Sequence, residues 1–530
     1  MKPSIQQTTV TAPAHRSPFS TGFLLIPLVL ACSGLLPAAR ATCQEGCDAS
    51  LGNTFLGDDS LLNNTSGHDN TAIGSDTLLN NTTGYFNTAA GHNVLYKNTT
   101  GSYNTATGFE ALFSNTTGYD NTAAGFGALE GNTTGINNTA VGALALGIST
   151  ASNNTAIGGS TLVFNTTGGD NTALGGNALY KNTTGSRNVA NGASALYSNQ
   201  IGIDNTAIGV NALYYNTGNY NTADGYQALE SNTTGSNNTA NGLNALNHNT
   251  TGSNNLANGA SALYNATTGS NNCAQGYKAL YLNTIGYQDT AVGALALYKN
   301  SSGINNVALG IDALYGNTTG NTNIGIGFAA GFNLTTGSNN IDIGNNGVVG
   351  ESATIRIGTT GSQTSTYIAG VSGVTVAGGV GVMVDSNGHF GTLVSSERFK
   401  DAIKPIDKAS EAILALKPVS FRYKHELDPE SIPQFGLVAE EVEKVNPDLV
   451  AHDDQGKPYT VRYEAVNAML LNEFLKEHCR MKEQVQMNQR QEATIARLER
   501  ALEEQAAQIQ KVSSQLNALG NDSRLVTNER

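Results

Sequence analysis

The sequence predicts a mainly β protein with a parallel β-roll or solenoid repeat shaft, followed by a small α/β domain and a C-terminal coiled coil. Three observations support this fold class. An asparagine-led repeat of 17 residues fills most of the chain, and no proline occurs between residues 38 and 404. Charge is concentrated behind the repeat, since 19 of the 28 Lys and Arg residues lie in the last 136 positions. A fixed period of this length is typical of stacked, one-dimensional architectures.

Residues 1–41 have the pattern of an export signal peptide. Basic residues precede an apolar run at residues 23–30, and Ala39-Arg40-Ala41 fits a signal peptidase site. A second interpretation makes Cys32 a lipidated cysteine. No later segment is long and apolar enough to span a bilayer. We therefore expect an exported protein, extracellular or on the bacterial surface, with no transmembrane segment in the mature chain.

Residues 42–52 form a short segment that contains two of the five cysteines. Cys43 and Cys47 could pair with each other or bridge neighbouring chains in an oxidising compartment. Cys273 replaces a repeat threonine, and Cys479 stands alone. Because two clustered cysteines without a nearby histidine do not make a metal site, we expect neither a metal nor a cofactor.

Residues 53–344 hold 18 repeat units, which begin at Asn53 and end with the unit led by Asn340. A typical unit starts Asn121-Thr122-Ala123-Ala124-Gly125. Leucine stands eight positions after the leading residue in 16 of the 18 units, so this column is the expected core. We expect stacked asparagines to bond from coil to coil, and the glycine of each unit to form a corner that a Cβ would obstruct.

The first residues of each unit predict a short strand with alternating inward and outward side chains. The threonine after the leading residue is expected to point inward, because apolar residues replace it at Val189, Leu256 and Ile324. The fourth position is expected to point outward, because it accepts polar residues, namely Asn191, Asp224 and Gln275.

The alanine and glycine columns leave each coil a thin core, which association of identical coils would thicken. The Asn-x-Ala-x-Gly units resemble the heads of trimeric autotransporter adhesins over residues 53–344. We favour such a trimeric roll over a single-chain solenoid. The surface suits an adhesive or spacer shaft better than an ice-binding one, because pairs such as Thr82-Thr83 point to opposite faces of a strand. A net charge of −13 argues against nucleic acid as a partner.

Residues 345–394 lose the period and predict a β-rich neck. Two short apolar segments are the expected strands, 353–357 and 374–377.

The tail after the neck carries three ordered blocks. These are Ser395-Ser396-Glu397-Arg398-Phe399-Lys400, then residues 416–423 and then residues 434–442. Together they resemble the intramolecular chaperone domain of endosialidases and other phage tail spikes, a family of self-cleaving serine peptidases. The resemblance implies a trimeric chaperone over residues 395–480, a catalytic dyad of Ser395 and Lys400, and cleavage between Val394 and Ser395. The family usually has aspartate directly after the serine, where this chain has Ser396.

The residues themselves are consistent with that chemistry. A serine nucleophile needs a base, and a lysine can serve where burial disfavours its charge. Side chains five residues apart point about 140° away from each other on a continuous helix. We therefore expect a bend between Ser395 and Lys400.

Residues 481–519 predict a coiled coil, and residues 520–530 a disordered tail. Apolar residues follow a 3-4 spacing that is broken at Gln505; they are Ile495, Leu498, Leu502, Ile509, Val512, Leu516 and Leu519. One amphipathic helix packed on the domain is the alternative. The number of three strands comes from the resemblance.

The combined interpretation is an exported homotrimeric fibre whose C-terminal domain directs assembly and then removes itself by a single-turnover serine endopeptidase reaction. The alternative is a non-enzymatic surface fibre that keeps this domain as a trimerisation cap. A phage tail fibre and an ice-binding solenoid fit less well. A cell-surface or glycan ligand of the shaft stays open.

Overall fold

The computed structural model describes residues 45–371, 376–385, 387–453 and 455–522. The expected signal peptide, Cys32, Cys43 and residues 523–530 lie outside these ranges. The chain divides into two units, one ending at Ser365 and one beginning at Thr366. Each unit is described by itself.

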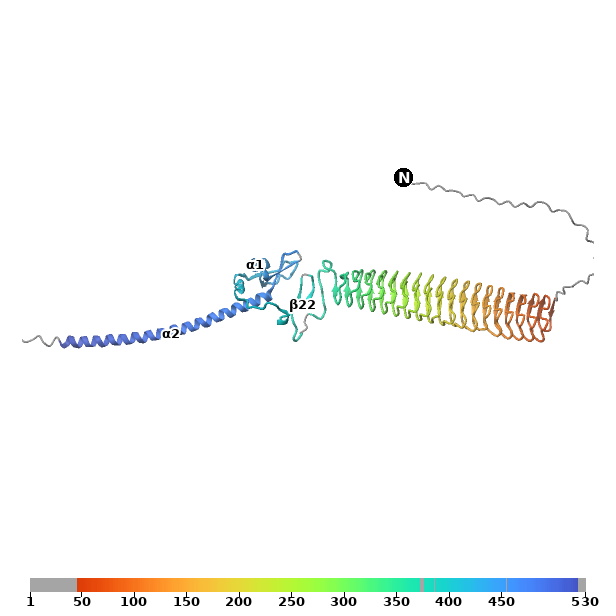
Figure 1. Cartoon of the computed structure of the whole chain (residues 1–530), viewed down its shortest axis with the longest axis horizontal. Helices are drawn as coiled ribbons and strands as arrows, with labels where there is room; N and C mark the ends of the chain where they lie inside the picture. The colour runs from red at the N-terminus through yellow and green to blue at the C-terminus, as the bar shows by residue number, and fades with distance from the viewer. Residues whose placement is uncertain (1–44, 372–375, 386, 454, 523–530) are drawn as a thin grey trace, which may run out of the picture. The chain divides into compact units, whose positions relative to one another are not determined.

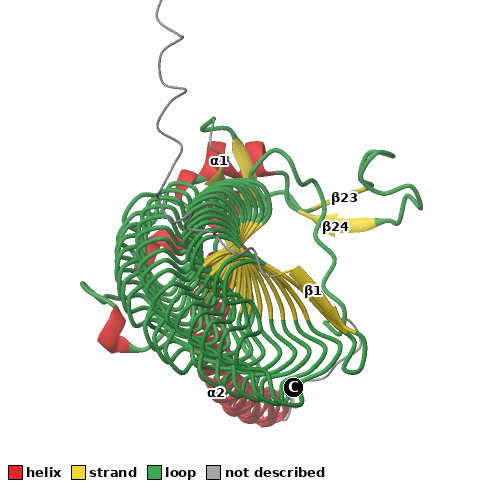
Figure 2. Ribbon diagram, turned by 90° about the vertical axis from the view of Figure 1, so that its right-hand side faces the viewer, coloured by secondary structure: helices red, strands yellow, loops and turns green. Residues whose placement is uncertain are grey.

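The first unit is a parallel β-solenoid of about 18 coils, which confirms the predicted fold class. Each coil contributes one short strand, and each strand pairs with the strand of the next coil, with equivalent residues opposite each other (Figure 1). Viewed along the shaft, the strands stack on one side of the coils in a twisted wall, and loops form the rest of each coil (Figure 2). The strands are β1 Glu45–Asp48, β2 Asn53–Leu56, β3 Thr71–Ile73, β4 Thr88–His92, β5 Thr105–Phe109, β6 Thr122–Ala124, β7 Thr139–Val141, β8 Thr155–Ile157, β9 Thr172–Leu174, β10 Val189–Asn191, β11 Thr206–Ile208, β12 Thr222–Asp224, β13 Thr239–Asn241, β14 Leu256–Asn258, β15 Cys273–Gln275, β16 Thr290–Val292, β17 Val307–Leu309, β18 Ile324–Ile326, β19 Ile341–Ile343 and β20 Ile355–Ile357.

The orientation predicted for the repeat threonine is wrong. The alanine that most shaft strands share, for example Ala190, is buried, whereas Val189 on one side of it is 40% exposed and Asn191 on the other side is also exposed. Alternation along a strand places the second and fourth positions on the same face. The side chain of the fourth position points outward, as predicted. The side chain of the second position must then point outward as well.

The leucine column forms the core, as predicted, and its backbone explains why leucine stands there in 16 of the 18 units. Leu78, Leu196 and their equivalents are buried and have φ between 51° and 54°, in the left-handed region. Residues branched at Cβ are strongly disfavoured in that region, whereas leucine branches one carbon further out. At the seventeenth coil, the place is taken by Gly331 with φ 66°.

Exchange of a core leucine for its β-branched isomer tests this explanation. Leu196→Ile keeps the side-chain volume but is expected to lower the free energy of unfolding by about 1–3 kcal/mol, because it strains the left-handed backbone. Leu196→Met, which has no branch at Cβ, is expected to cost less than about 1.5 kcal/mol. Denaturant midpoints of the two variants measure the difference, and equal losses would contradict the backbone explanation.

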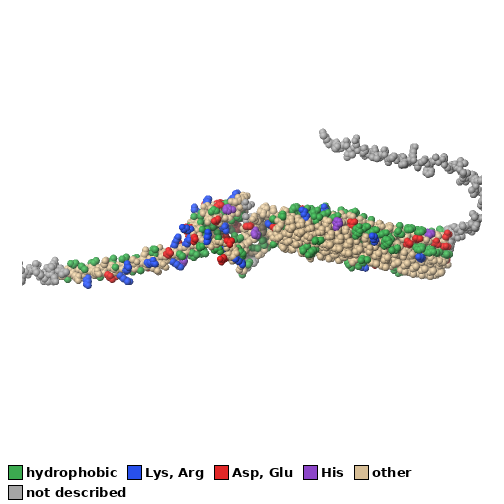
Figure 3. Space-filling view, in the orientation of Figure 1, with side chains coloured by type: hydrophobic (Ala, Val, Ile, Leu, Met, Phe, Trp, Pro, Cys, Tyr) green, Lys and Arg blue, Asp and Glu red, His purple; other side chains and the backbone are tan. Residues whose placement is uncertain are grey.

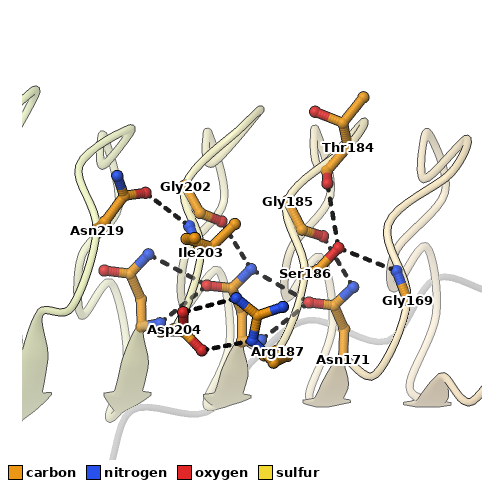
Figure 4. A network of polar contacts seen from close by, with 12 residues as sticks. Gly169, Asn171, Thr184, Gly185, Ser186, Arg187, Gly202, Ile203, Asp204 and Asn219 are labelled. Carbon is orange, nitrogen blue, oxygen red and sulfur yellow. Dashed lines mark hydrogen bonds and ion pairs between the residues drawn. The ribbon is translucent and has the colours of Figure 1, made fainter.

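The predicted asparagine ladder is present along the shaft. Asn188 donates from its backbone N–H and from Nδ2 to Oδ1 of Asn171, at 3.0 and 3.2 Å, and Nδ2 of Asn171 also donates to the carbonyl of Gly185 (Figure 4). On the surface of the same coils, Arg187 makes a two-pronged ion pair with Asp204 at 2.7 and 2.8 Å. The Arg187 guanidinium lowers the pKa of the Asp204 carboxyl. Neighbouring coils are thus joined by the repeated asparagine bonds and, at single places, by specific pairs such as Arg187 and Asp204.

A second ladder uses the asparagines of the Asn-Thr-Thr triplets. Nδ2 of Asn132 donates to Oδ1 of Asn115 at 3.0 Å and to the carbonyl of Gly135 at 3.1 Å, and both asparagines are fully buried. These triplets match the N-glycosylation pattern, yet their amides face inward. The N-glycosylation pattern in these triplets therefore follows from the ladder.

Both ends of the shaft differ from the repeat. At the N-terminal end, β1 pairs antiparallel with β2, a cap that the sequence did not predict, and Phe55 packs on the core where later coils have alanine. At the other end, Asp342 takes the alanine position. The core leucines and alanines are buried within a single chain. Each chain thus closes its own coils, and the association of three shafts stays a prediction.

The neck departs from prediction at two places. The segment 353–357 does contain a strand, β20, but this strand continues the shaft sheet by pairing with β19. For the segment 374–377, residues 374 and 375 lie outside the described ranges, and Val376 and Ala377 are not in a strand. An antiparallel hairpin occurs further on instead, formed by β21 Val382–Val384 and β22 Phe390–Thr392.

The second unit continues with a small domain and one long helix. A compact core joins the domain to the start of the helix; its buried residues are Val442, Leu449, Val450 and Val461. The elements are the 3₁₀ helices η1 Glu397–Phe399, η2 Asp407–Ala415 and η3 Pro447–Leu449, the strand pairs β23 Val419–Phe421 with β24 Gln434–Gly436 and β25 Val450–His452 with β26 Pro458–Val461, and the helices α1 Ala439–Val445 and α2 Tyr463–Asp522.

The long helix α2 crosses the expected boundary between residues 480 and 481, and it includes residues 520–522 of the expected disordered tail. Its apolar residues at the 3-4 spacing, from Ile495 to Leu516, are at least half exposed in the single chain. The helix is therefore established, and its pairing in a coiled coil stays a prediction.

Candidate functional site

Ser395 and Lys400 lie within hydrogen-bond distance of each other. Nζ of Lys400 donates to Oγ of Ser395 at 3.1 Å. The single 3₁₀ turn η1 stands between them, with extended backbone at Ser396 (φ −65°, ψ 142°) and at Lys400 (φ −130°, ψ 135°). This is the bend that the spacing of five residues requires. The structure thus brings together the two side chains that the sequence singled out.

The surroundings of this pair are open in the single chain. Ser395 and Lys400 are both exposed, as are the flanking apolar residues Val394 and Phe399. The guanidinium of Arg398 lies over the ring of Phe399 at 4.5 Å. Because a lysine accepts a proton only in its neutral form, which burial favours, the pair has a suitable distance but no dry environment in one chain.

His389 takes no part in the pair. Its ring is 82% exposed and lies 3.9 Å from the carboxylate of Asp385.

A polar cluster that the sequence analysis missed holds η2 against α2. The hydroxyl of the fully buried Ser410 donates to Oε1 of Glu473 at 2.5 Å and accepts from Nδ2 of Asn472 at 2.7 Å and from Nζ of Lys476 at 3.2 Å. Nζ of Lys476 also donates to the carbonyl of Asp407 at 2.7 Å. The residues from η2 and those from α2 are more than 60 positions apart in the sequence, so no local motif could reveal the cluster. The cluster ties the segment that follows Lys400 to the long helix.

Comparison with known proteins gives one match. Residues 395–451 match the peptidase family model described as "Chaperone of endosialidase". The match starts at Ser395, covers a small part of the chain and supports the expected intramolecular chaperone domain. No curated protein and no solved structure matches the chain.

Charge is unevenly distributed over the described residues. Few charged side chains occur on the visible face of the shaft, and many occur on the small domain and on α2 (Figure 3). None of the helices in the described ranges is long and apolar enough to cross a membrane. Within those ranges, no group of three or more His, Cys, Asp or Glu residues is placed to hold a metal ion.

Proposed function

We propose that the chain is an exported fibre whose C-terminal domain directs the assembly of three copies and then cuts itself off between Val394 and Ser395. The observation that carries this proposal is the 3.1 Å contact of Lys400 Nζ with Ser395 Oγ, at the first residue of the chaperone match. Residues 395–480 would be the chaperone, and residues 481–519 would supply a coiled coil. Residues 53–344 would form a surface shaft, preceded by the segment 42–52 and followed by the neck 345–394.

The proposed reaction has two steps. Neutral Lys400 accepts the hydroxyl proton of Ser395 while Oγ attacks the carbonyl carbon of Val394. The Val394–Ser395 amide bond breaks, an ester bond forms, and the proton passes to the released amino group of Ser395. Water then hydrolyses the ester. One fragment ends with the carboxylate of Val394, and the other begins with Ser395 and its restored hydroxyl.

Assembly and cleavage are linked in this proposal through desolvation. A charged lysine is the stable form in water, and removal from water favours the neutral form that acts as a base. Since the pair is exposed in one chain, contacts with other copies must supply the dry environment. Cleavage would then follow assembly rather than precede it.

A second candidate function is a permanent trimerisation cap that does not cut itself. The presence of Ser396, where the family usually has aspartate, favours it, together with the exposure of the pair. The fold and the assembly role are the same in both candidates.

The alanine variant of the nucleophile separates the two candidates. Wild-type chain is expected to give two fragments on a denaturing gel, with mass analysis finding one fragment that starts at Ser395. Ser395→Ala is expected to stay whole, because it lacks the attacking oxygen. Ser396→Ala is the neighbouring control and is expected to cleave. Identical band patterns for Ser395→Ala and wild type would exclude self-cleavage and leave the cap.

A further inference from the structure

We infer that one face of the hairpin β21–β22 binds the same hairpin of other copies of this chain, and that this contact covers the Ser395–Lys400 pair. The inference rests on the proposed function and names the surface through which assembly would act on the site.

The register of the hairpin gathers apolar side chains on one face. Val384 lies opposite Phe390, and Val382 lies opposite Thr392. Directly opposed residues of antiparallel strands point to the same side, and alternate residues of a strand share that side. Val382, Val384 and Phe390 therefore form a single face, which we call the hairpin face.

The hairpin face is open in the single chain. Its three apolar side chains are 62%, 56% and 66% exposed, and the next residues towards the scissile bond, Leu393 and Val394, are exposed as well. By contrast, the shaft buries its core completely. An isolated two-stranded hairpin is marginally stable in water at best. A hairpin with such a face needs a partner surface.

The exposed apolar surface of one hairpin is smaller than a complete interface. The side chains concerned are those of the hairpin face and the two residues nearest the scissile bond, and they are 56–66% exposed; they are Val382, Val384, Phe390, Leu393 and Val394. At roughly 60–120 Å² for a fully exposed side chain, the five present roughly 200–350 Å². One partner contributes about 800 Å² to a standard protein interface, so the hairpin face would be one part of a larger contact between copies.

A second copy is the partner that fits best. After Gly391 and Thr392, exposed apolar side chains follow again at Leu393 and Val394, and the chaperone match begins at the next residue, Ser395. A domain that assembles identical chains in register brings the hairpins of the copies to the same position along the fibre axis. The described residues between 376 and 394 include only two titratable side chains, Asp385 and His389, so a partner that binds through charge has little to contact.

The same contact would complete the candidate site. Only two residues separate Thr392, the end of β22, from Ser395. Packing of three hairpin faces would therefore remove water close to the Ser395–Lys400 pair, which one chain leaves open. The hairpin face would thus be the surface whose burial makes the Ser395–Lys400 pair able to react.

Thiol labelling of the full-length chain in a Ser395→Ala background tests the contact without cleavage. The thiol of Val384→Cys is expected to react with a maleimide at least about tenfold more slowly than the thiol of Ile285→Cys, because the reaction requires an exposed thiolate. Ile285 is the matched control, since it is 55% exposed on a shaft loop against 56% for Val384. Peptide mapping separates these sites from the native cysteines of the chain, which are Cys32, Cys43, Cys47, Cys273 and Cys479. Equal labelling of the two positions, or a monomeric chain in sedimentation, would overturn the inference.

The effect on the site is tested in the chain that keeps Ser395. Phe390→Ser is expected to slow cleavage at least about tenfold, whereas Ile285→Ser leaves the rate unchanged. Cleavage at the wild-type rate in Phe390→Ser would overturn the inference while the proposed function stands. Conversely, identical bands for wild type and Ser395→Ala would exclude the proposed cleavage, and the labelling test would still decide whether the hairpin face is covered.

Discussion

Lys400→Met is expected to reduce self-cleavage by at least about 100-fold, because it removes the only amine placed against the Ser395 hydroxyl in the described residues. Methionine keeps much of the length of the side chain and cannot accept a proton. Lys404→Met is the matched control, because Lys404 is an exposed lysine of the same segment that makes no contact with Ser395. Gel densitometry over time gives the two rates.

Lys400→Arg distinguishes a base from a structural contact. Arginine retains a positive charge and hydrogen-bond donors, but it does not lose its proton in proteins. If Lys400 acts as a base, the arginine variant is as inactive as the methionine variant. Cleavage by Lys400→Arg at a near-normal rate would mean that the lysine only positions the serine. The double variant Ser395→Ala, Lys400→Met should be no worse than either single one, since the two groups act as a unit.

Asp289→Asn is expected to stabilise the shaft markedly above neutral pH. Asp289 is the single acidic residue among the 18 leading positions of the repeat, and it is only 1% exposed. Its carboxyl accepts from the backbone N–H and Nδ2 of Asn306 and from Nδ2 of Asn300. Burial raises the pKa of Asp289 to about 7, although these hydrogen bonds act in the opposite direction.

The sign of the pH dependence follows from proton binding. The unfolded chain has the ordinary aspartate pKa of 3.8, so the folded chain holds the proton more tightly between that value and about 7. The free energy of unfolding therefore falls as pH rises through this window, by up to about 4 kcal/mol at roughly 1.4 kcal/mol for each pH unit. Asparagine carries no such penalty. The gain from Asp289→Asn should be large at pH 8 and small at pH 4.

Denaturant unfolding at several pH values measures this gain. Asp224→Asn is the control, because Asp224 is exposed on the outer face of a strand and should show little change at either pH. Hydrogen exchange localises the effect, since coils in a repeat array interact chiefly with their neighbours. A gain that is the same at pH 4 and pH 8 would show that the charge of Asp289 is not the cause.

The repeat could be predicted from the sequence because each coil solves the same packing problem. The leucine column, the glycine corner and the asparagine ladder each recur at one position of the unit, so their roles could be inferred from the repeated pattern alone. The threonine column could not be oriented in this way. Apolar replacements such as Val189 were interpreted as inward residues, yet they lie on the outer face of the strand. The single alanine between them and the fourth position fills the narrow interior of the coil.

The candidate site was predictable in part. The bend at Ser395 and Lys400 follows from their spacing, and the three sequence blocks supplied the type of chemistry. The openness of the pair could not be predicted, because exposure depends on the whole fold. The contacts of Ser410 with Glu473 and Lys476 join segments that share no pattern in the sequence. The hairpin at residues 382–392 was missed because its short strands occur once, without the repetition that revealed the equally short strands of the shaft.

The direction of the ladder bonds has a mechanical consequence. The bonds between coils, such as those from Asn188 to Asn171, run along the shaft, so tension applied at its two ends loads them directly rather than in shear. Coils should then detach one by one from an end, and each 17-residue unit would release roughly 55–60 Å of extended chain. Under tension, a fibre of this kind would lengthen in equal steps and absorb mechanical energy, instead of breaking at once.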